Sequence, residues 1–390
     1  MNKDNLSYFI YYKEVMAKYL IKSISIILML GGVTFSQNFK FIAMSDSRGS
    51  DMGVNKKVLS SLVEHMIKTQ PDAKFVLFAG DLVDGSKSNP NQTVKELLNW
   101  KEVMSPIYNN PKMVWPKIWI VVGNHEVQHP KDEENFRKIF PDVFLNGPAD
   151  EKGISYSFDY EKHHFVFVTS DRWYYGKPND TTDDKRDWHY IKNLDWLEND
   201  LKEARKREVS DIFVISHEPA FPIGGHLRDG LPNLALNLKL PLDSTRQWYF
   251  DQRNEFLRIL KDYKVTAYIC GHEHLYGRES VDGIYQIVAG SSGAPLYYFN
   301  PKHDEPKNPE QEFTYEEAIP YYKTLNYFYG PGENSQASKD FVGMRAFEYV
   351  VFDVKKKKVD VTTYGAFPKE KTNDKLGSEI KMIDKFKIKK

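Results

Sequence analysis

The clearest pattern in this chain is a set of short apolar runs, each of which ends in polar side chains. They lie at residues 39–44, 75–79, 118–122, 212–215 and 265–269. Short apolar runs bounded by turn residues are typical of strands that are buried on both faces. In open α/β sheets, ligands gather outside the carboxyl ends of such strands. We therefore expect the polar side chains after these runs to line a site.

Helices are predicted between these strands. Apolar side chains at helical spacing mark residues 54–69, 93–104, 191–207 and 248–263. Alternation of strand and helix implies βαβ units and a largely parallel sheet, so the fold class is α/β. Later strands are expected at 285–289, 346–354 and 359–364, which fits a second sheet packed on the first.

A hairpin is predicted from two alternating runs, 154–160 and 164–169, with its turn at Glu161-Lys162. His163 and His164 fall at this turn, away from the strand ends that carry the other polar residues. We interpret both histidines as surface or structural residues.

Composition and charge exclude little. A chain of 390 residues is long enough for one large α/β domain. Lys+Arg and Asp+Glu both number 54, so the charge gives no sign of a surface for nucleic acid. The single cysteine, Cys270, rules out an internal disulfide framework and is read as a core residue.

Residues 1–36 differ from the rest of the chain. Lys18 and Lys22 give a short basic region, 24–30 is apolar, and 31–36 supplies small residues. This is the layout of a secretory signal peptide cleaved after Ser36, with Met16 as an alternative start. We expect export to the periplasm or the extracellular space. The apolar stretch is short for a membrane span, so membrane attachment is expected only if the segment stays uncleaved.

The polar ends of the strand-like runs form five short motifs. In chain order they are Asp46-Ser47-Arg48, Gly80-Asp81-Leu82-Val83-Asp84, Gly123-Asn124-His125-Glu126, Ser216-His217-Glu218 and Gly271-His272-Glu273-His274. Carboxylate, amide oxygen and imidazole together suit a hard-to-borderline metal ion rather than a thiolate site. In this order, the motifs resemble the calcineurin-like metallophosphoesterase superfamily over residues 38–295.

The resemblance implies a four-layer α/β/β/α sandwich and a centre of two divalent or trivalent metal ions, such as Mn, Fe or Zn. Two cations about 3.5–4 Å apart need an anion between them, and Asp81 matches the family's bridging carboxylate. The implied ligands are Asp46, Asp81 and His274 for the first metal, and Asp81, Asn124, His217 and His272 for the second. His125 matches the family's proton donor to the leaving group, and the attacking group is a hydroxide held by the metals.

One position departs from the family. The usual first motif is Asp-x-His, but Arg48 stands in place of the histidine and a guanidinium cannot bind a cation. Three accounts remain open. In the first, Asp84 supplies an oxygen ligand to the first metal, from the position where purple acid phosphatases carry a tyrosine ligand. In the second, water fills the vacant ligand position and Arg48 binds a substrate phosphate oxygen. In the third, the first metal is weakly bound or absent. The continuation to Tyr276 and Arg278 leans towards the purple acid phosphatase branch.

The expected domain runs from 37 to 366, with a loop insertion at about 296–340 and a mobile Lys-rich tail at 367–390. A Gly/Pro/Leu-rich loop, 221–242, is long enough to be functional, and His226 within it is a weak candidate for substrate contact.

The expected function is hydrolysis of phosphate mono- or diesters, with small phosphorylated substrates such as nucleotides or sugar phosphates. The alternative is a catalytically silent relative that binds a ligand at the same face, and the altered Arg48 motif is its support. A nuclease-type diesterase would need a basic groove, which the balanced charge does not indicate.

Overall fold

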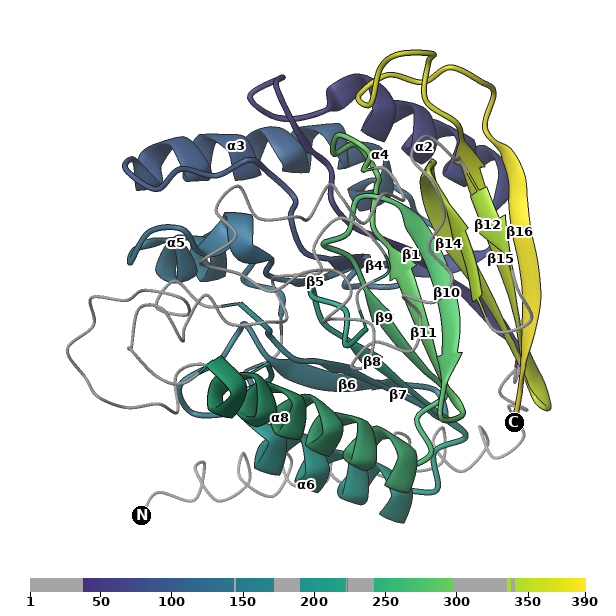
Figure 1. Cartoon of the computed structure of the whole chain (residues 1–390). Helices are drawn as coiled ribbons and strands as arrows, with labels where there is room; N and C mark the ends of the chain where they lie inside the picture. Colours follow the sequence, from purple (N-terminus) through teal and green to yellow (C-terminus); the bar gives the residue numbers. More distant parts are fainter. Residues whose placement is uncertain are drawn as a thin grey trace, which may run out of the picture. The chain divides into compact units, whose positions relative to one another are not determined.

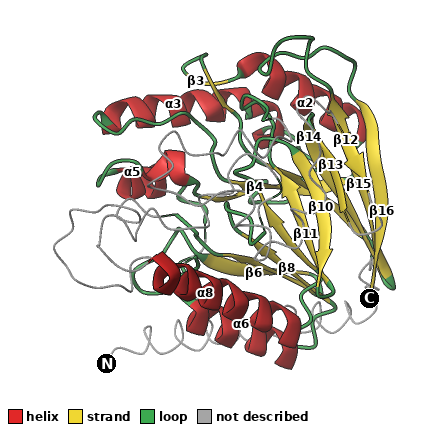
Figure 2. Ribbon diagram, in the orientation of Figure 1, coloured by secondary structure: helices red, strands yellow, loops and turns green. Residues whose placement is uncertain are grey.

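The structure is a computed structural model that describes residues 38–143, 145–171, 190–221, 223, 242–297, 335–337 and 341–390. Within residues 38–390, two large sheets lie face to face and helices cover both outer sides (Figures 1 and 2). The predicted α/β/β/α sandwich is confirmed. Among the described residues, no helix is long and apolar enough to cross a bilayer. The predicted signal peptide and His226 lie outside the described residues.

The first sheet has six strands in the order β16-β15-β14-β1-β4-β5. Their bounds are β1 Phe39–Met44, β4 Ala73–Ala79, β5 Ile118–Val121, β14 Phe347–Lys355, β15 Lys358–Ala366 and β16 Lys381–Lys389. The strands β1, β4 and β5 are parallel, and β14, β15 and β16 continue the sheet by antiparallel pairing. A short ribbon of β2 (Arg48–Gly49) and β3 (Gly53–Val54) follows β1.

The second sheet has the order β12-β13-β10-β11-β9-β8-β7-β6. Its strands are β6 Tyr156–Tyr160, β7 His163–Phe167, β8 Asp211–Ile215, β9 Ala267–Cys270, β10 Tyr276–Val281, β11 Ile284–Ala289, β12 Ser335–Ala337 and β13 Phe341–Met344. The five predicted strands that carry the motifs are therefore divided between two sheets. The later strands are divided as well, because 284–289 joins the second sheet whereas 347–355 and 358–366 join the first.

Helices cover each sheet on its outer side. Those near the first sheet are α2 (Lys56–Thr69), α3 (Pro90–Val103), α4 (Ser105–Tyr108) and α5 (Asp132–Ile139), and those near the second are α6 (Leu194–Lys206) and α8 (Leu242–Asp262). The helix α2 begins where the Asn55 side chain accepts a hydrogen bond from the Val58 N–H. Its apolar face, which includes Leu59 and Leu62, is fully buried against the first sheet.

Aromatic side chains fill the space between the two sheets. The ring of Phe41 on β1 lies 4.6 Å from that of Phe352 on β14 and 5.0 Å from that of Phe213 on β8, so it joins both sheets. Phe75 on β4 meets Phe165 on β7 at 5.3 Å in an edge-to-face pair. This packing fixes the ends of β1, β4, β8 and β9 relative to one another.

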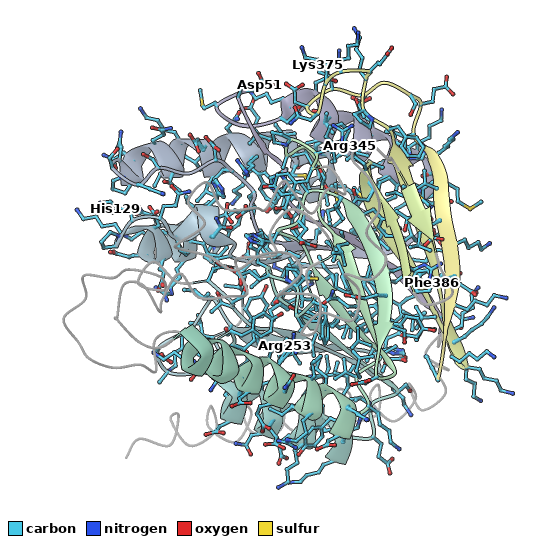
Figure 3. The ribbon with its side chains drawn as sticks, viewed as in Figure 1. Asp51, His129, Arg253, Arg345, Lys375 and Phe386 are labelled. Atoms are coloured by element: carbon cyan, nitrogen blue, oxygen red, sulfur yellow. The ribbon has the colours of Figure 1, made fainter. Side chains whose placement is uncertain are left out.

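The C-terminal residues are not a mobile tail, as the Lys-rich composition suggested. Residues 381–389 form β16 at the edge of the first sheet, with Phe386 (labelled in Figure 3) stacked on Tyr285 of the second sheet. The Asp384 carboxylate accepts from Tyr276 at 2.7 Å and from Arg278 Nε at 2.6 Å. These contacts hold the strand, and composition alone could not reveal them. Both Tyr276 and Arg278 bind Asp384 through their side chains.

His164 has a structural role in the hairpin of β6 and β7, as expected. Its buried imidazole lies 2.6 Å from Asp159 Oδ1 through Nδ1 and 2.7 Å from Asp200 Oδ2 through Nε2. Burial opposes protonation of the ring, but the hydrogen bonds and charges of the two carboxylates outweigh it and raise the pKa of His164.

We therefore expect His164 to make stability depend on pH. A raised folded-state pKa gives stabilisation that is complete below the unfolded value of about 6.5 and is lost as pH rises through the folded value. The variant His164→Gln does not titrate, so its free energy of unfolding in urea should fall less than that of the wild type over this range. Identical pH profiles for the two proteins would contradict the ion pairing.

Candidate metal centre

The chain turns sharply at three of the strand ends that carry candidate ligands. Asp46 after β1, Asp81 after β4 and His272 after β9 have positive φ angles of 53°, 52° and 69°. Non-glycine residues seldom adopt this conformation, and when they do it is often at functional sites. Each turn directs a side chain away from its strand into the same region between the two sheets.

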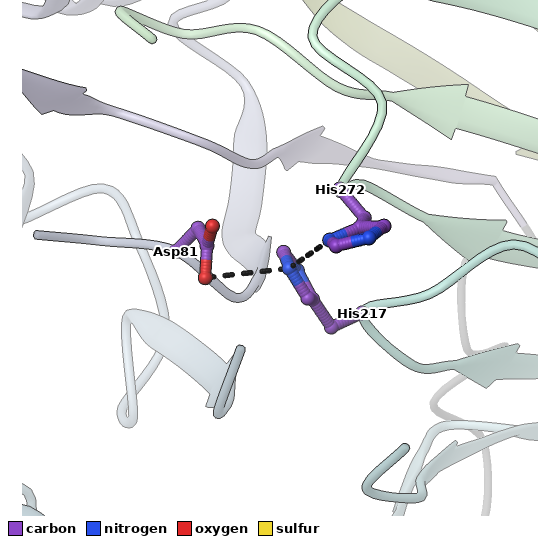
Figure 4. A group of neighbouring side chains, drawn as sticks. All are labelled: Asp81, His217 and His272. Atoms are coloured by element: carbon purple, nitrogen blue, oxygen red, sulfur yellow. Dashed lines mark hydrogen bonds and ion pairs between the residues drawn. The ribbon is translucent and has the colours of Figure 1, made fainter. Parts of the chain in front are cut away.

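The first group of candidate ligands surrounds the Nε2 atom of His217 (Figure 4). That nitrogen lies 3.3 Å from Asp81 Oδ1, 3.2 Å from Asn124 Oδ1 and 3.1 Å from His272 Nδ1. The other ring nitrogen of His217, Nδ1, donates to the Ala79 carbonyl at 2.7 Å. This bond fixes the tautomer and leaves the lone pair of Nε2 directed at the group, as in many metal-binding histidines.

The second group consists of Asp46, Asp81 and His274, whose ligand atoms all lie within 4.8 Å of one another. The Oδ2 atom of Asp46 accepts from Ser45 Oγ at 2.6 Å and from the His272 N–H at 2.8 Å. Its Oδ1 atom is buried without a hydrogen-bond partner among the described residues, and lies 3.5 Å from His274 Nε2. His274 Nδ1 donates to the Pro295 carbonyl at 2.8 Å, so Nε2 faces the group.

The buried negative charges of the two ligand groups favour binding of a positive ion. Asp46 and Asp81 are both buried, and burial raises the pKa of Asp46 to about 7 against the attraction of His217. Burial also works against ionisation of Asp81, but the charges of His217 and His125 hold the pKa of Asp81 well below its ordinary value. Two buried carboxylates, one with an oxygen that lacks a hydrogen-bond partner among the described residues, and two imidazoles held by carbonyls at Nδ1 fit the metal pair that the motifs imply.

Glu126 supports the site rather than forming part of it. Its buried carboxylate accepts from the backbone N–H groups of Asp81 at 2.8 Å, Val83 at 3.1 Å and Gly123 at 2.9 Å. These bonds hold the turns after β4 and β5 together. A side chain on Gly123 would overlap the Asp81 carboxylate, which explains the glycine before Asn124.

His125 lies beside the ligands without joining either group. Its backbone N–H donates to Asp81 Oδ1 at 3.0 Å, and its Nδ1 donates to the Asp84 carbonyl at 2.5 Å. The remaining nitrogen, Nε2, lies 3.8 Å from Asp81 Oδ2. The ring is therefore held with Nε2 near Asp81, as the role expected from the resemblance requires.

Arg48 and Asp84 occupy the position of the missing family ligand. Arg48 Nη1 lies 3.4 Å from Asp84 Oδ1, and Arg48 Nε lies 3.9 Å from Asp81 Oδ2. The Asp84 carboxylate is 54% exposed and turned towards Arg48, and it belongs to neither ligand group. The contact brings the residues of the first two accounts side by side, and the choice between those accounts stays a prediction.

Tyr297 is a site residue that the motifs did not reveal. Its ring stacks on that of His274, with the centroids 4.2 Å apart and the planes at 15°, and it lies close enough to Arg48 for each side chain to affect the pKa of the other. It lies beyond the last motif, at the end of a described segment, and no spacing rule connects it to the others.

Comparison with known proteins agrees with this geometry. The model of the calcineurin-like phosphoesterase family matches residues 39–276, which is more than half of the chain. The chain therefore belongs to the calcineurin-like phosphoesterase family, as its motifs predicted.

Individual relatives are more distant. Acid phosphatase type 7 of Mus musculus is 26% identical over 186 residues, which cover 46% of this chain and 36% of that protein. Purple acid phosphatase PPD1 from yellow lupin (Lupinus luteus) seeds superimposes with a TM-score of 0.55 at 12% identity, covering 91% of this chain and 54% of that chain. This chain thus spans about a third of the curated relative and about half of the lupin chain. The lupin match shows the fold, and the similarity to the mouse acid phosphatase is in keeping with the predicted branch.

Metal binding should stabilise the folded protein. Ions that bind only the native state add about 2.7 kcal/mol at a free concentration one hundred times the dissociation constant. We expect Mn²⁺ or Zn²⁺ to raise the melting temperature and EDTA to lower it, and Asp81→Asn to abolish both the shift and most of the bound metal measured by mass spectrometry. The matched control is Asp195→Asn, an exposed residue of α6. A full shift in Asp81→Asn would contradict the shared ligand.

Proposed function

We propose that this protein is a metal-dependent phosphatase that hydrolyses phosphate esters. The observation that carries the proposal is the sharing of Asp81 by two ligand groups, with His125 beside them and outside both. Membership of the phosphoesterase family and similarity to an acid phosphatase support the same chemistry. The candidate ligands are Asp46, Asp81, Asn124, His217, His272 and His274.

The chain's own residues would divide the work. A bound metal pair would supply charge that polarises the phosphoryl group and favours deprotonation of water at neutral pH. Asp81, held by the backbone N–H of His125, keeps the two ligand groups together. The Asp84 carbonyl holds the Nδ1 proton of His125, so that protonated Nε2 is the atom that donates to the leaving oxygen.

We also propose export through a cleaved signal peptide. The support is the sequence of residues 1–36 alone. The mature protein recovered from the periplasm or the medium should begin at Gln37, as N-terminal sequencing would show. Recovery of the intact N-terminus in the membrane fraction would instead indicate an uncleaved anchor.

The altered first motif favours one other candidate, a silent relative that binds a ligand without turnover. Arg48 replaces an expected ligand, which is compatible with loss of the first metal. Hydrolysis is the better supported reading, because the ligand-type side chains are present and His125 is held in one tautomer. Fewer than one bound ion per purified chain would favour the silent protein.

Activity should depend on His125 according to the leaving group. Loss of a general acid typically lowers the rate by about 10²–10⁴-fold, and a poor leaving group depends on it most. We expect His125→Ala to reduce kcat strongly for an alkyl ester such as glycerol phosphate and much less for p-nitrophenyl phosphate, while metal content is retained. His129→Ala, four residues further on, is the control. Equal losses on the two esters would show that His125 does not donate the proton.

A further inference from the structure

A cavity of about 340 Å³ lies on the outer face of the first sheet, far from the candidate metal ligands. Lys40, near the start of β1, lines it, whereas Asp46 follows the other end of the same strand. An extended strand rises about 3.3 Å per residue, so about 20 Å of chain separates the two positions. The volume falls within the range of about 300–1,000 Å³ that is usual for small-ligand sites.

The pleat of the strands directs polar side chains into this cavity. On the edge strand β16, Phe386 packs between the two sheets, and its neighbours Lys385 and Lys387 line the cavity on the opposite face. The helix α2 lies on the same outer side of the sheet (Figure 1) and ends at Thr69. Gln70, the next residue, lines the cavity where the helix stops.

The lining carries more positive than negative charge. Its only acidic residues are two aspartates, whereas its basic residues are Lys40, Lys355, Lys358, Lys385 and Lys387. The cavity therefore has a surplus of three positive charges. The whole chain has 54 basic and 54 acidic residues, so the balanced total conceals this local excess.

The two aspartates are occupied by two of the lysines. Lys355 Nζ lies 2.8 Å from Asp353 Oδ2 and 2.6 Å from Asp360 Oδ2, and Lys358 Nζ lies 2.9 Å from Asp360 Oδ1. Lys385 and Lys387 form no ion pair with any residue in the described part of the chain. Their ammonium groups remain available to an anion at the edge of the sheet.

Neutral polar groups in the lining also lack partners. Gln70 is only 7% exposed, yet its side-chain amide makes no hydrogen bond to another described residue. Buried polar side chains are normally hydrogen-bonded, and one left without a partner lowers stability. The hydroxyls of Thr362 and Tyr364 line the same cavity, and the Tyr364 ring is held against that of Tyr349 with the centroids 5.5 Å apart.

We propose that this cavity binds a small organic polyanion, with sulfate, phosphate or carboxylate groups on a polar frame. The lysines of β16 match the charged groups, and the amide and hydroxyls match the frame. Lysines on an edge strand also discourage pairing with other chains, but that role requires neither Lys40 nor the buried amide of Gln70. The aspartates beside Lys355 would repel a continuous polyanion, so a small ligand fits better than a nucleic acid. The inference does not depend on the proposed reaction.

The experiment is calorimetric titration of the metal-loaded protein with naphthalenetrisulfonate, whose sulfonates are not esters and bind metal ions weakly. We expect one trisulfonate per chain, bound at least about tenfold more tightly than benzenesulfonate, which has a single charge. The double variant Lys385→Gln, Lys387→Gln should lower the affinity at least about tenfold. Gln70→Ala keeps every charge and should lower it about fivefold.

The matched control is the double variant Lys375→Gln, Lys381→Gln, which removes the same charge from exposed positions outside the cavity. Its affinity should change less than about twofold, because salt screens exposed charges at a distance. Unchanged melting temperatures would show that each variant is folded.

Absence of trisulfonate binding, equal losses in the two double variants, or full affinity in Gln70→Ala would each overturn the proposed site. Displacement of the trisulfonate by vesicles of phosphatidylglycerol or by a DNA oligonucleotide, with tighter binding of either, would overturn the small ligand and assign the face to a larger polyanion.

Discussion

The structure depends on holding one buried carboxylate, Asp81, between ligands that come from two different sheets. A charged oxygen in a dry interior is unfavourable unless donors or cations surround it. Here the His125 N–H and His217 Nε2 approach one oxygen, and Arg48 and His125 Nε2 flank the other. The negative charge of Asp81 is therefore stabilised by the same groups that the proposed reaction uses. Stability of the fold and the proposed chemistry both require these groups to surround Asp81.

Ligand residues themselves join the two sheets at this point. The His272 N–H, after β9 of the second sheet, donates to Asp46 after β1 of the first, and the His217 ring donates to the Ala79 carbonyl of β4. Aromatic packing along the strands sets the distance between the sheets, and these two bonds set the register of their tips. The precision that a metal site needs thus comes from the strands that carry the candidate ligands.

Sequence reasoning predicted the ligand-bearing strand ends because each motif is local: an apolar run, a turn and a polar side chain lie within a few residues. It could not predict how the strands divide between sheets, since all five runs have the same character and only long-range pairing separates β4 from β8. The strand β16 was missed because its Lys-rich sequence disguises the inward-facing Phe386 and Asp384. Tyr297 was missed because stacking on His274 is a tertiary contact with no counterpart in sequence spacing.

The replacement of a histidine by Arg48 need not signal decay of the site. A histidine there would add a neutral ligand, whereas the arginine adds a permanent charge next to Asp81. That charge would compete with a weakly held metal, yet it would also attract an anionic substrate of the kind that the proposed reaction uses. Arg48 contacts Asp84 through Nη1 and keeps a buried Nε–H without a hydrogen-bond partner among the described residues. A buried donor without a partner suits a group that binds an anion, as the proposed function requires of Arg48.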